Sequence, residues 1–365
     1  MRLKSNTSIR NAVAEGYRDE SQFMDSQSLR LYAYVLIVSL YVVVQSTAAQ
    51  DSSLPSTPAA NQVAAANAGD VQSELAVARA YYDGITVRRN YPQAVTWFTA
   101  ASKQGSFEAA AWMGSCYLYG RGVQQNIPNA LTLIQGAAQA NDPVGLRFLG
   151  LMYEQGQGLP RDYVKARQAF VRATQKKDPH SFDQLGLLYL RGLGVKKNVY
   201  QAARFFTQGA RLGDSWSQLN LAEMYENGSA PHRRGSGHSQ NYAMALELYE
   251  ESAAQGNKVA AFKLGHMYEL GLGVAQDYAQ AAQYYRHSAD RFYAPAQVAL
   301  GNAAELGLGA EVDQVYAYVW YTLAADQGDG DAERRLAVLK SKMKAGDLQQ
   351  GQGLVSQMEA MRSDD

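Results

Sequence analysis

Hydrophobic and small residues recur along most of the chain with a fixed period. A small residue directly after an apolar one falls at Ala78, Gly114, Gly150, Gly186, Ala222, Gly265 and Gly301. Each step is 36 residues, except for a step of 43 between Ala222 and Gly265. An Asn or Asp, then an Ala, then a large apolar residue recur in the same register. A period of this length is typical of repeat architectures. It predicts seven repeats over residues 73–332, one of them with an insertion.

Each repeat is predicted to fold as two helices joined by a tight turn. Leu185 and Tyr189 are four residues apart and share one helical face, where Gly186 lets a neighbouring helix approach. A glycine then ends the first helix, a second glycine allows the turn, and the recurring Asn or Asp caps the second helix. A single hairpin cannot bury its apolar face, so the units must stack. The recurring tyrosines are Tyr117, Tyr153, Tyr189, Tyr225 and Tyr268.

The phrases LGLMYEQGQGLPRDYVKA, LGLLYLRGLGVKKNVYQA and LGHMYELGLGVAQDYAQA resemble the Sel-1-like repeat family, a relative of the tetratricopeptide repeat. The resemblance implies an all-α fold: a right-handed α-solenoid of seven 36-residue helix-turn-helix repeats with a C-terminal helical cap. It also implies a superhelical scaffold with a concave binding face, and bacterial members that often act outside the cytoplasm. Asn141 and Lys177 replace the closing glycine and Ala304 replaces the tyrosine, which predicts local differences in turn geometry.

Residues 1–49 read as a targeting segment. The run from Leu31 to Val44 is apolar apart from Ser39, follows Arg30, and is shorter than the roughly 20 residues of a membrane-spanning helix. Small residues follow up to Ala49, as at a signal-peptidase site, so we expect a signal peptide, with Met24 as an alternative start that gives it a normal length. The expected location is periplasmic or secreted. The alternative is an uncleaved anchor in the inner membrane, with the chain facing the periplasm.

The segments on either side of the repeats have different compositions. Residues 50–72 are rich in Ala, Ser, Pro, Gln and Asn, which predicts a disordered linker. Residues 333–365 are charged and predict two helices that cap the last repeat. A docking helix for a partner is the alternative for this tail.

Composition excludes several classes of function. The chain carries 34 basic and 34 acidic residues, so no basic excess points to nucleic acid. The single cysteine excludes an internal disulfide framework and an all-cysteine zinc site. We expect Cys116 to be a partly exposed surface thiol. We expect no cofactor and no metal.

Motifs that could carry catalysis are weak. Ser341 to Lys344 fits the S-x-x-K motif of penicillin-recognising enzymes, yet no K-T-G element follows. Gly213-Asp214-Ser215 resembles the start of an esterase motif but lies at a repeat junction. A cysteine-rich branch of the resembled family is linked to penicillin binding, and the single cysteine argues against membership in that branch.

Two features are candidates for partner binding. Glutamates follow the tyrosine position in four repeats, and stacking would align them as an acidic strip on the concave face: Glu154, Glu226, Glu269 and Glu305. Leu118 and Leu190 interrupt the strip and make that face mixed, which suits protein recognition. The insertion at 229–240 supplies His232, Arg233, Arg234 and His238, either as a solvated loop or as a contact for an acidic partner or sugar phosphate.

These observations favour a non-catalytic scaffold or adaptor of the bacterial cell envelope that binds protein partners along its concave face. The first alternative is a cell-wall-acting or penicillin-binding enzyme. The second is a structural component of a flagellar motor or an exopolysaccharide secretion complex. Membrane contact is expected only through the N-terminal segment.

Overall fold

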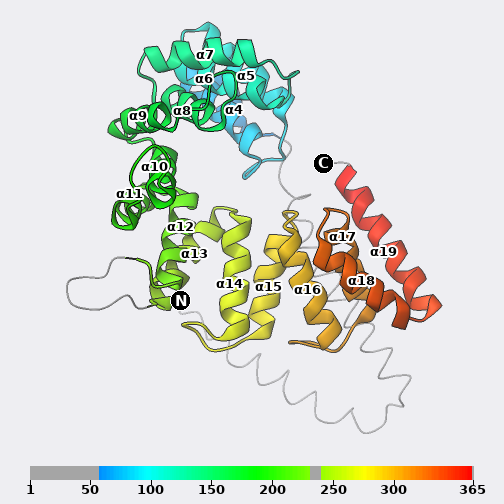
Figure 1. The fold of residues 1–365 in the computed structure, drawn as a ribbon. Helices are drawn as coiled ribbons and strands as arrows, with labels where there is room; N and C mark the ends of the chain where they lie inside the picture. The colour runs from blue at the N-terminus through cyan, green and yellow to red at the C-terminus, as the bar shows by residue number, and fades with distance from the viewer. Residues whose placement is uncertain (1–56, 231–239, 364–365) are drawn as a thin grey trace, which may run out of the picture. The chain divides into compact units, whose positions relative to one another are not determined.

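The computed structural model describes residues 57–230 and 240–363. This part of the chain holds 17 helices, α3 to α19, and no strand (Figure 1). No helix within the described ranges is long and apolar enough to cross a membrane. The predicted targeting segment lies outside the described residues. The structure confirms an all-helical solenoid.

Seven hairpins of two helices follow one another along the chain, as the repeat pattern predicts. Helices of one hairpin pack against each other, and each hairpin packs on the next. The pairs are α4 (Val71–Asp83) with α5 (Tyr91–Lys103), α6 (Phe107–Tyr119) with α7 (Ile127–Gln139), α8 (Pro143–Gln155) with α9 (Tyr163–Gln175), α10 (Pro179–Arg191) with α11 (Val199–Arg211), α12 (Ser215–Glu226) with α13 (Tyr242–Ala254), α14 (Lys258–Leu270) with α15 (Tyr278–Ala289), and α16 (Ala294–Leu306) with α17 (Gln314–Ala325).

One backbone hydrogen bond closes the turn of every hairpin. In the third repeat, Gly156 ends α8 in the left-handed conformation, with φ 72°, and its N–H donates to the carbonyl of Met152. The side chain of Asp162 then accepts from the first amides of α9. The backbone N–H of Asp162 donates to the carbonyl of Tyr153 at 2.9 Å. The same bond joins the equivalent residues of all the other repeats.

Inside each repeat, the small residue of the first helix faces a large side chain of the second. A Cβ atom added at Gly150 would lie 2.4 Å from Cε1 of Phe170. The rings of Phe206, Tyr285 and Tyr321 and the side chain of Ile134 fill the same place, at 2.4–2.6 Å from an added Cβ, over the other predicted glycines: Gly114, Gly186, Gly265 and Gly301. These large side chains are almost fully buried. The glycines therefore set how closely the two helices approach.

The second glycine of the turn has a role that the sequence analysis missed. Gly194 has φ 62°, and a Cβ there would lie 2.6 Å from the carbonyl carbon of Tyr163 in the preceding repeat. Gly122 approaches Tyr91 in the same way, at 2.5 Å. This glycine thus allows the tight turn and also lets one repeat rest against the backbone of the previous one.

The insertion leaves the fifth repeat in register. The N–H of Ala230 donates to the carbonyl of Met224, and Asn241 still donates to Tyr225 at 2.9 Å, as its equivalents do elsewhere. The fifth repeat therefore keeps the turn bond of the other repeats despite the insertion between its two helices. The predicted contact residues His232, Arg233, Arg234 and His238 lie outside the described residues.

The N-terminal end of the repeat array differs from the prediction, whereas the C-terminal end carries two helices as expected. The predicted disordered linker contains a helix, α3 (Ala60–Asn67), which packs against α4 and buries Ala66. At the other end, α18 (Gly330–Lys342) and α19 (Ala345–Ser363) both pack on α17. Val355 of α19 is buried there, and an added Cβ at Gly351 would lie 2.5 Å from the ring of Tyr318.

The prediction for Cys116 is wrong. Its side chain is fully buried in α6, among the first core cluster, rather than at the surface. Burial raises the pKa of the Cys116 thiol to about 12, against a smaller opposing effect of Arg121. A buried, protonated thiol is a poor nucleophile. The residue therefore serves packing.

Three residues that are not glycine occupy the left-handed conformation at repeat junctions: Asn141, Lys177 and Phe292, with φ of 60°, 61° and 55°. Other repeats place a glycine there, such as Gly213 with φ 81°. A side chain in this conformation costs roughly 1–2 kcal/mol. Asn tolerates it better than Lys or Phe.

Replacing Lys177 by glycine is therefore expected to stabilise the protein by about 1 kcal/mol, because the strain disappears. Urea unfolding followed by circular dichroism measures this. Lys177→Ala removes the same charge but keeps the strain, and should change stability little. The reverse change, Gly213→Lys, should destabilise, since its site has open space and only the backbone strain differs. Equal stabilisation by the Ala and Gly variants would contradict the strain argument.

Candidate binding surface

The first helices of neighbouring repeats contact each other directly in two places, α6 with α8 and α10 with α12. We call the first helices together the first-helix layer, and the recurring tyrosines lie on it. All five predicted tyrosines are half-buried. The rings of Tyr189 and Tyr268 stack on Phe205 and Tyr284 of their own second helices, with centroids 5.3 and 5.4 Å apart. The carbonyl oxygens of the tyrosines also accept the hydrogen bond that closes the turn. The tyrosines therefore link the two helices of the hairpin.

Three of the four predicted glutamates are hydrogen-bonded within their own repeat. Glu226 and Glu269 accept from the hydroxyls of Tyr249 and Tyr285. Glu305 accepts from Tyr321 at 2.9 Å. Burial, reinforced by the neighbouring carboxylate, raises the pKa of each tyrosine, so the hydroxyl stays a donor. These glutamates have a structural partner and form no free acidic strip.

Glu154 is the exception, because its repeat carries Phe170 where the others carry a tyrosine. No hydroxyl is available from that ring. Burial raises the pKa of Glu154, and Arg191 opposes the shift. Leu118, which was expected to share this face, is fully buried. Of the predicted strip, Glu154 is thus the carboxylate left for an external contact.

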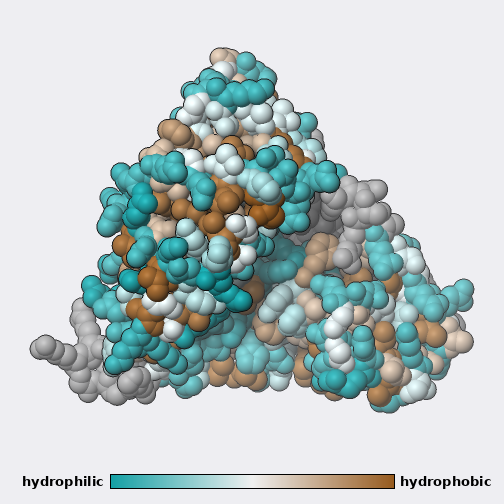
Figure 2. Space-filling view, turned by 45° about the horizontal axis from the view of Figure 1, so that its top comes forward, coloured by the Kyte–Doolittle hydropathy of each residue, from teal (hydrophilic) through white to brown (hydrophobic). Residues whose placement is uncertain are grey.

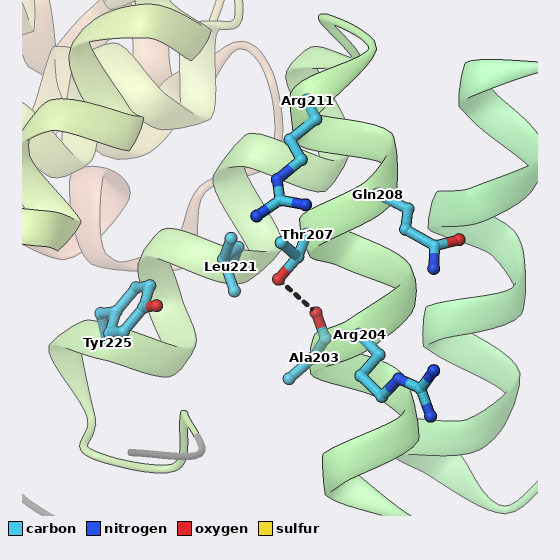
Figure 3. Close-up of a pocket in the computed structure, with 7 residues that line it drawn as sticks. All are labelled: Ala203, Arg204, Thr207, Gln208, Arg211, Leu221 and Tyr225. Carbon is cyan, nitrogen blue, oxygen red and sulfur yellow. Dashed lines mark hydrogen bonds between the residues drawn. The ribbon is translucent and has the colours of Figure 1, made fainter. Parts of the chain in front are cut away.

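A pocket that the sequence analysis did not predict opens between α11 and α12. Its volume is about 230 Å³, and Tyr225 joins its lining with Ala203, Arg204, Thr207, Gln208, Arg211 and Leu221. Figure 3 shows Arg211 leaning toward Leu221, whereas Arg204 and Gln208 leave α11 on the side away from α12. Arg204 occupies a position where other repeats carry uncharged or acidic residues, and only Lys103 of the first repeat matches the charge of Arg211, so no recurring pattern marked them.

A small acid–base cluster lies at the junction of the fourth and fifth repeats. His180 Nδ1 is 2.5 Å from Asp214 Oδ1, and Asp214 caps α12 by accepting from the N–H of Ser217. Burial, with the nearby Asp214 charge, raises the pKa of Asp183 to about 7, and a hydrogen bond from Asn220 opposes this. Asp183 is only 4% exposed. A substrate has no access to it, so the cluster joins repeats.

Gly213-Asp214-Ser215, the esterase-like sequence, is therefore a helix cap, with Asp214 as the capping residue. Among the described residues, no group of three or more His, Cys, Asp or Glu side chains could hold a metal ion.

The last residue of the first helix varies from repeat to repeat and is exposed in the third, fourth, sixth and seventh repeats. Gln155 and Arg191 occupy this position in the third and fourth repeats, and Leu270 and Leu306 in the sixth and seventh, where they are 52% and 65% exposed. We call these four residues the helix-end row. Figure 2 shows hydrophobic residues in separate areas with hydrophilic ones between them. The row thus combines a polar part with an apolar part.

The sequence held a signal for the tyrosine–glutamate bonds that went unused. In the fifth to seventh repeats, Tyr249, Tyr285 and Tyr321 accompany a glutamate on the first helix. In the fourth repeat, Phe206 accompanies Leu190 instead. Of the four glutamates at this position, only Glu154 is accompanied by a phenylalanine, Phe170, instead of a tyrosine.

Phe170→Tyr is expected to supply the missing donor to Glu154. Because the folded pKa of Glu154 is raised, its contribution to stability is greatest at low pH and is lost as pH rises through that pKa. A hydroxyl that bonds the carboxylate reverses this loss. The variant should gain about 1 kcal/mol at pH 7 and less at pH 4, measured by urea unfolding at both values.

Tyr285→Phe is the matched control, since it removes the same bond from Glu269 and should lose stability. A gain from Phe170→Tyr that is equal at both pH values would contradict the proposed bond.

Comparisons with known proteins agree with this fold. A family model described as Sel1 repeat matches residues 69–106, 107–142, 143–174, 184–214, 217–257, 258–291 and 294–329. A search of curated proteins gives no match. A Sel1 repeat protein from Oxalobacter formigenes is 28% identical, with a TM-score of 0.55, over 75% of this chain and 77% of that one.

Two further solved structures are similar. A protective antigen of uropathogenic Escherichia coli strains with an SLR fold is 26% identical, with a TM-score of 0.42, over 81% of this chain and 70% of that one. An immunity protein from Pseudomonas aeruginosa is 21% identical, with a TM-score of 0.44, over 58% and 80%. The seven matched repeats cover most of the chain, and the chain therefore belongs to the Sel1 repeat family.

Proposed function

We propose that this chain is a non-catalytic adaptor of the bacterial cell envelope that binds a protein partner along its first-helix layer. Sel1 repeat proteins are generally protein-interaction scaffolds. The observation that carries the proposal is the helix-end row. Its members share one register position on the first helices of four repeats, yet they differ in chemistry and stay exposed, while the glycine five residues before each of them is constant.

A constant frame with a variable exposed row suits recognition at several points at once. The polar half of the row, Gln155 and Arg191, lies next to Glu154, so that half can take hydrogen bonds and charge. The apolar half, Leu270 and Leu306, can bury surface against a partner. Interfaces commonly combine such an apolar part with polar contacts. An enzyme is less well supported, because both carboxylates of the cluster around His180, those of Asp183 and Asp214, are buried.

The envelope location rests on the sequence alone. The apolar run from Leu31 to Val44, with small residues after it, supports export to the periplasm or beyond. Protease treatment of intact and permeabilised cells tests it. We expect the chain to be degraded only after the outer membrane is opened or to be found in the medium. If the chain resists the protease until the inner membrane is broken, the envelope location is wrong. That result would not bear on the proposed binding surface.

Photo-crosslinking tests the binding surface. A photoreactive residue placed at Leu270 or Leu306 of the full chain, expressed in the source bacterium, should capture one and the same protein. Val338 on α18 is 52% exposed and serves as the matched position outside the row. Leu270→Asp with Leu306→Asp should reduce recovery of that protein at least about tenfold, since a charge replaces an apolar contact. Equal capture at Val338, or no effect of the double change, would contradict the proposal.

A further inference from the structure

The neutral net charge of the chain hides a strong local imbalance. Residues 143–213, which form the third and fourth repeats, carry twelve Lys or Arg against four Asp or Glu. Because the whole chain is neutral, the remaining residues carry the opposite excess. Of the four acids, Asp178 and Asp183 are buried, and Asp178 is paired with Arg147 at 3.0 Å. The positive charges at the surface of these repeats are therefore poorly balanced.

Four of these charges form an ordered set on the second helices, which we call the basic face. Lys165 and Arg172 lie seven residues apart on α9, and Arg204 and Arg211 lie seven apart on α11. All four are exposed. Since the repeat is 36 residues, Arg204 matches the level of Gln168 on α9, and Arg211 matches Gln175. The two charges of each helix thus lie about two helical turns apart along its axis, and the α11 pair is offset by three residues from the α9 pair in the repeat register.

The charges of the basic face are largely unneutralised. Arg172 donates to neutral acceptors, Asn141 Oδ1 at 3.1 Å and the carbonyl of Ala138 at 3.3 Å. Lys165 is 3.7 Å from Asp162, which also caps its own helix. Among the described residues, no hydrogen bond or ion pair links the side chain of Arg204 or Arg211 to a protein group. Their guanidinium groups are therefore available for carboxylates, which they can bind in bidentate fashion.

Apolar side chains and a pocket border the basic face. Val164 and Tyr200 occupy the same position on α9 and α11 and are 45% and 59% exposed. The pocket beside Arg211 has Leu221 and Tyr225 on its far wall. A surface that alternates cations with apolar side chains matches a polypeptide that alternates carboxylates with apolar side chains. A nucleic-acid duplex would use the positive charges but would leave Val164 and the apolar wall of the pocket without a partner. A flat lipid surface would meet the charges and the exposed side chains but would leave the pocket between α11 and α12 unfilled.

We infer that the basic face of the third and fourth repeats is a second docking surface, which binds an acidic polypeptide segment containing apolar side chains. Arg204 and Arg211 hold its carboxylates, and the pocket between α11 and α12 takes an apolar side chain. The surface lies on second helices and differs in chemistry from the helix-end row. It therefore stands independently of the proposed adaptor function.

The test uses the full chain and a fluorescent synthetic peptide of four Glu-Glu-Phe-Gly units. Binding by anisotropy should weaken at least about tenfold in Arg204→Glu with Arg211→Glu, because both carboxylate contacts become repulsive. It should also weaken as the salt concentration rises. Lys342→Glu with Lys344→Glu changes two exposed cations on the C-terminal cap and is the matched control, expected to alter binding by less than about threefold.

Other probes separate the competing partners. A duplex oligonucleotide and phosphatidylglycerol vesicles should bind more weakly than the peptide at equal salt. A peptide with glutamines in place of glutamates should not bind. Two results would overturn the inference: tighter binding of the oligonucleotide or vesicles, or peptide binding that the two arginine changes leave intact. Self-association of the full chain that the same changes abolish would also contradict it, because the partner would then be a second copy of the chain.

Discussion

The close approach of the two helices within each repeat is the constraint on which the rest of the structure depends. At five of the seven repeats this approach requires a glycine, because the side chain of the second helix fills the space that a Cβ would occupy. Phe170 over Gly150 and Phe206 over Gly186 show the same contact, 36 residues apart. An interior packed this tightly tolerates little added volume. The repeat therefore keeps its geometry while its surface changes.

Because the repeat geometry is constant, the residues at exposed positions can vary from repeat to repeat. The turn bond from Asn241 to Tyr225 persists beside the insertion, so extra residues do not disturb the stack. The helix-end row and the basic face both lie on positions that no packing rule restricts. They can acquire different chemistry in each repeat, which is how a solenoid presents several surfaces on one frame.

The sequence predicted the fold well because its determinants are local and repeated. The glycines, tyrosines and capping residues recur in phase, and each has one structural reason. The surfaces were harder to predict for the opposite reason. Arg204 and Arg211 belong to one repeat only, and global neutrality concealed the local excess of charge. Cys116 was misplaced because a variable position was taken as an exposed one, although it packs in the core. The helix α3 escaped prediction because its residues are small and polar.

A double-mutant cycle at Gly150 and Phe170 tests the central constraint most directly. Gly150→Ala should destabilise by about 1–3 kcal/mol, because its Cβ meets the ring. Combined with Phe170→Leu, it should cost at least about 0.5 kcal/mol less than the sum of the single changes. Gly136→Ala on α7, where an added Cβ meets nothing within 4 Å, should instead stabilise by about 0.5–1 kcal/mol. Additive costs at Gly150 and Phe170, or equal effects at Gly150 and Gly136, would contradict the account.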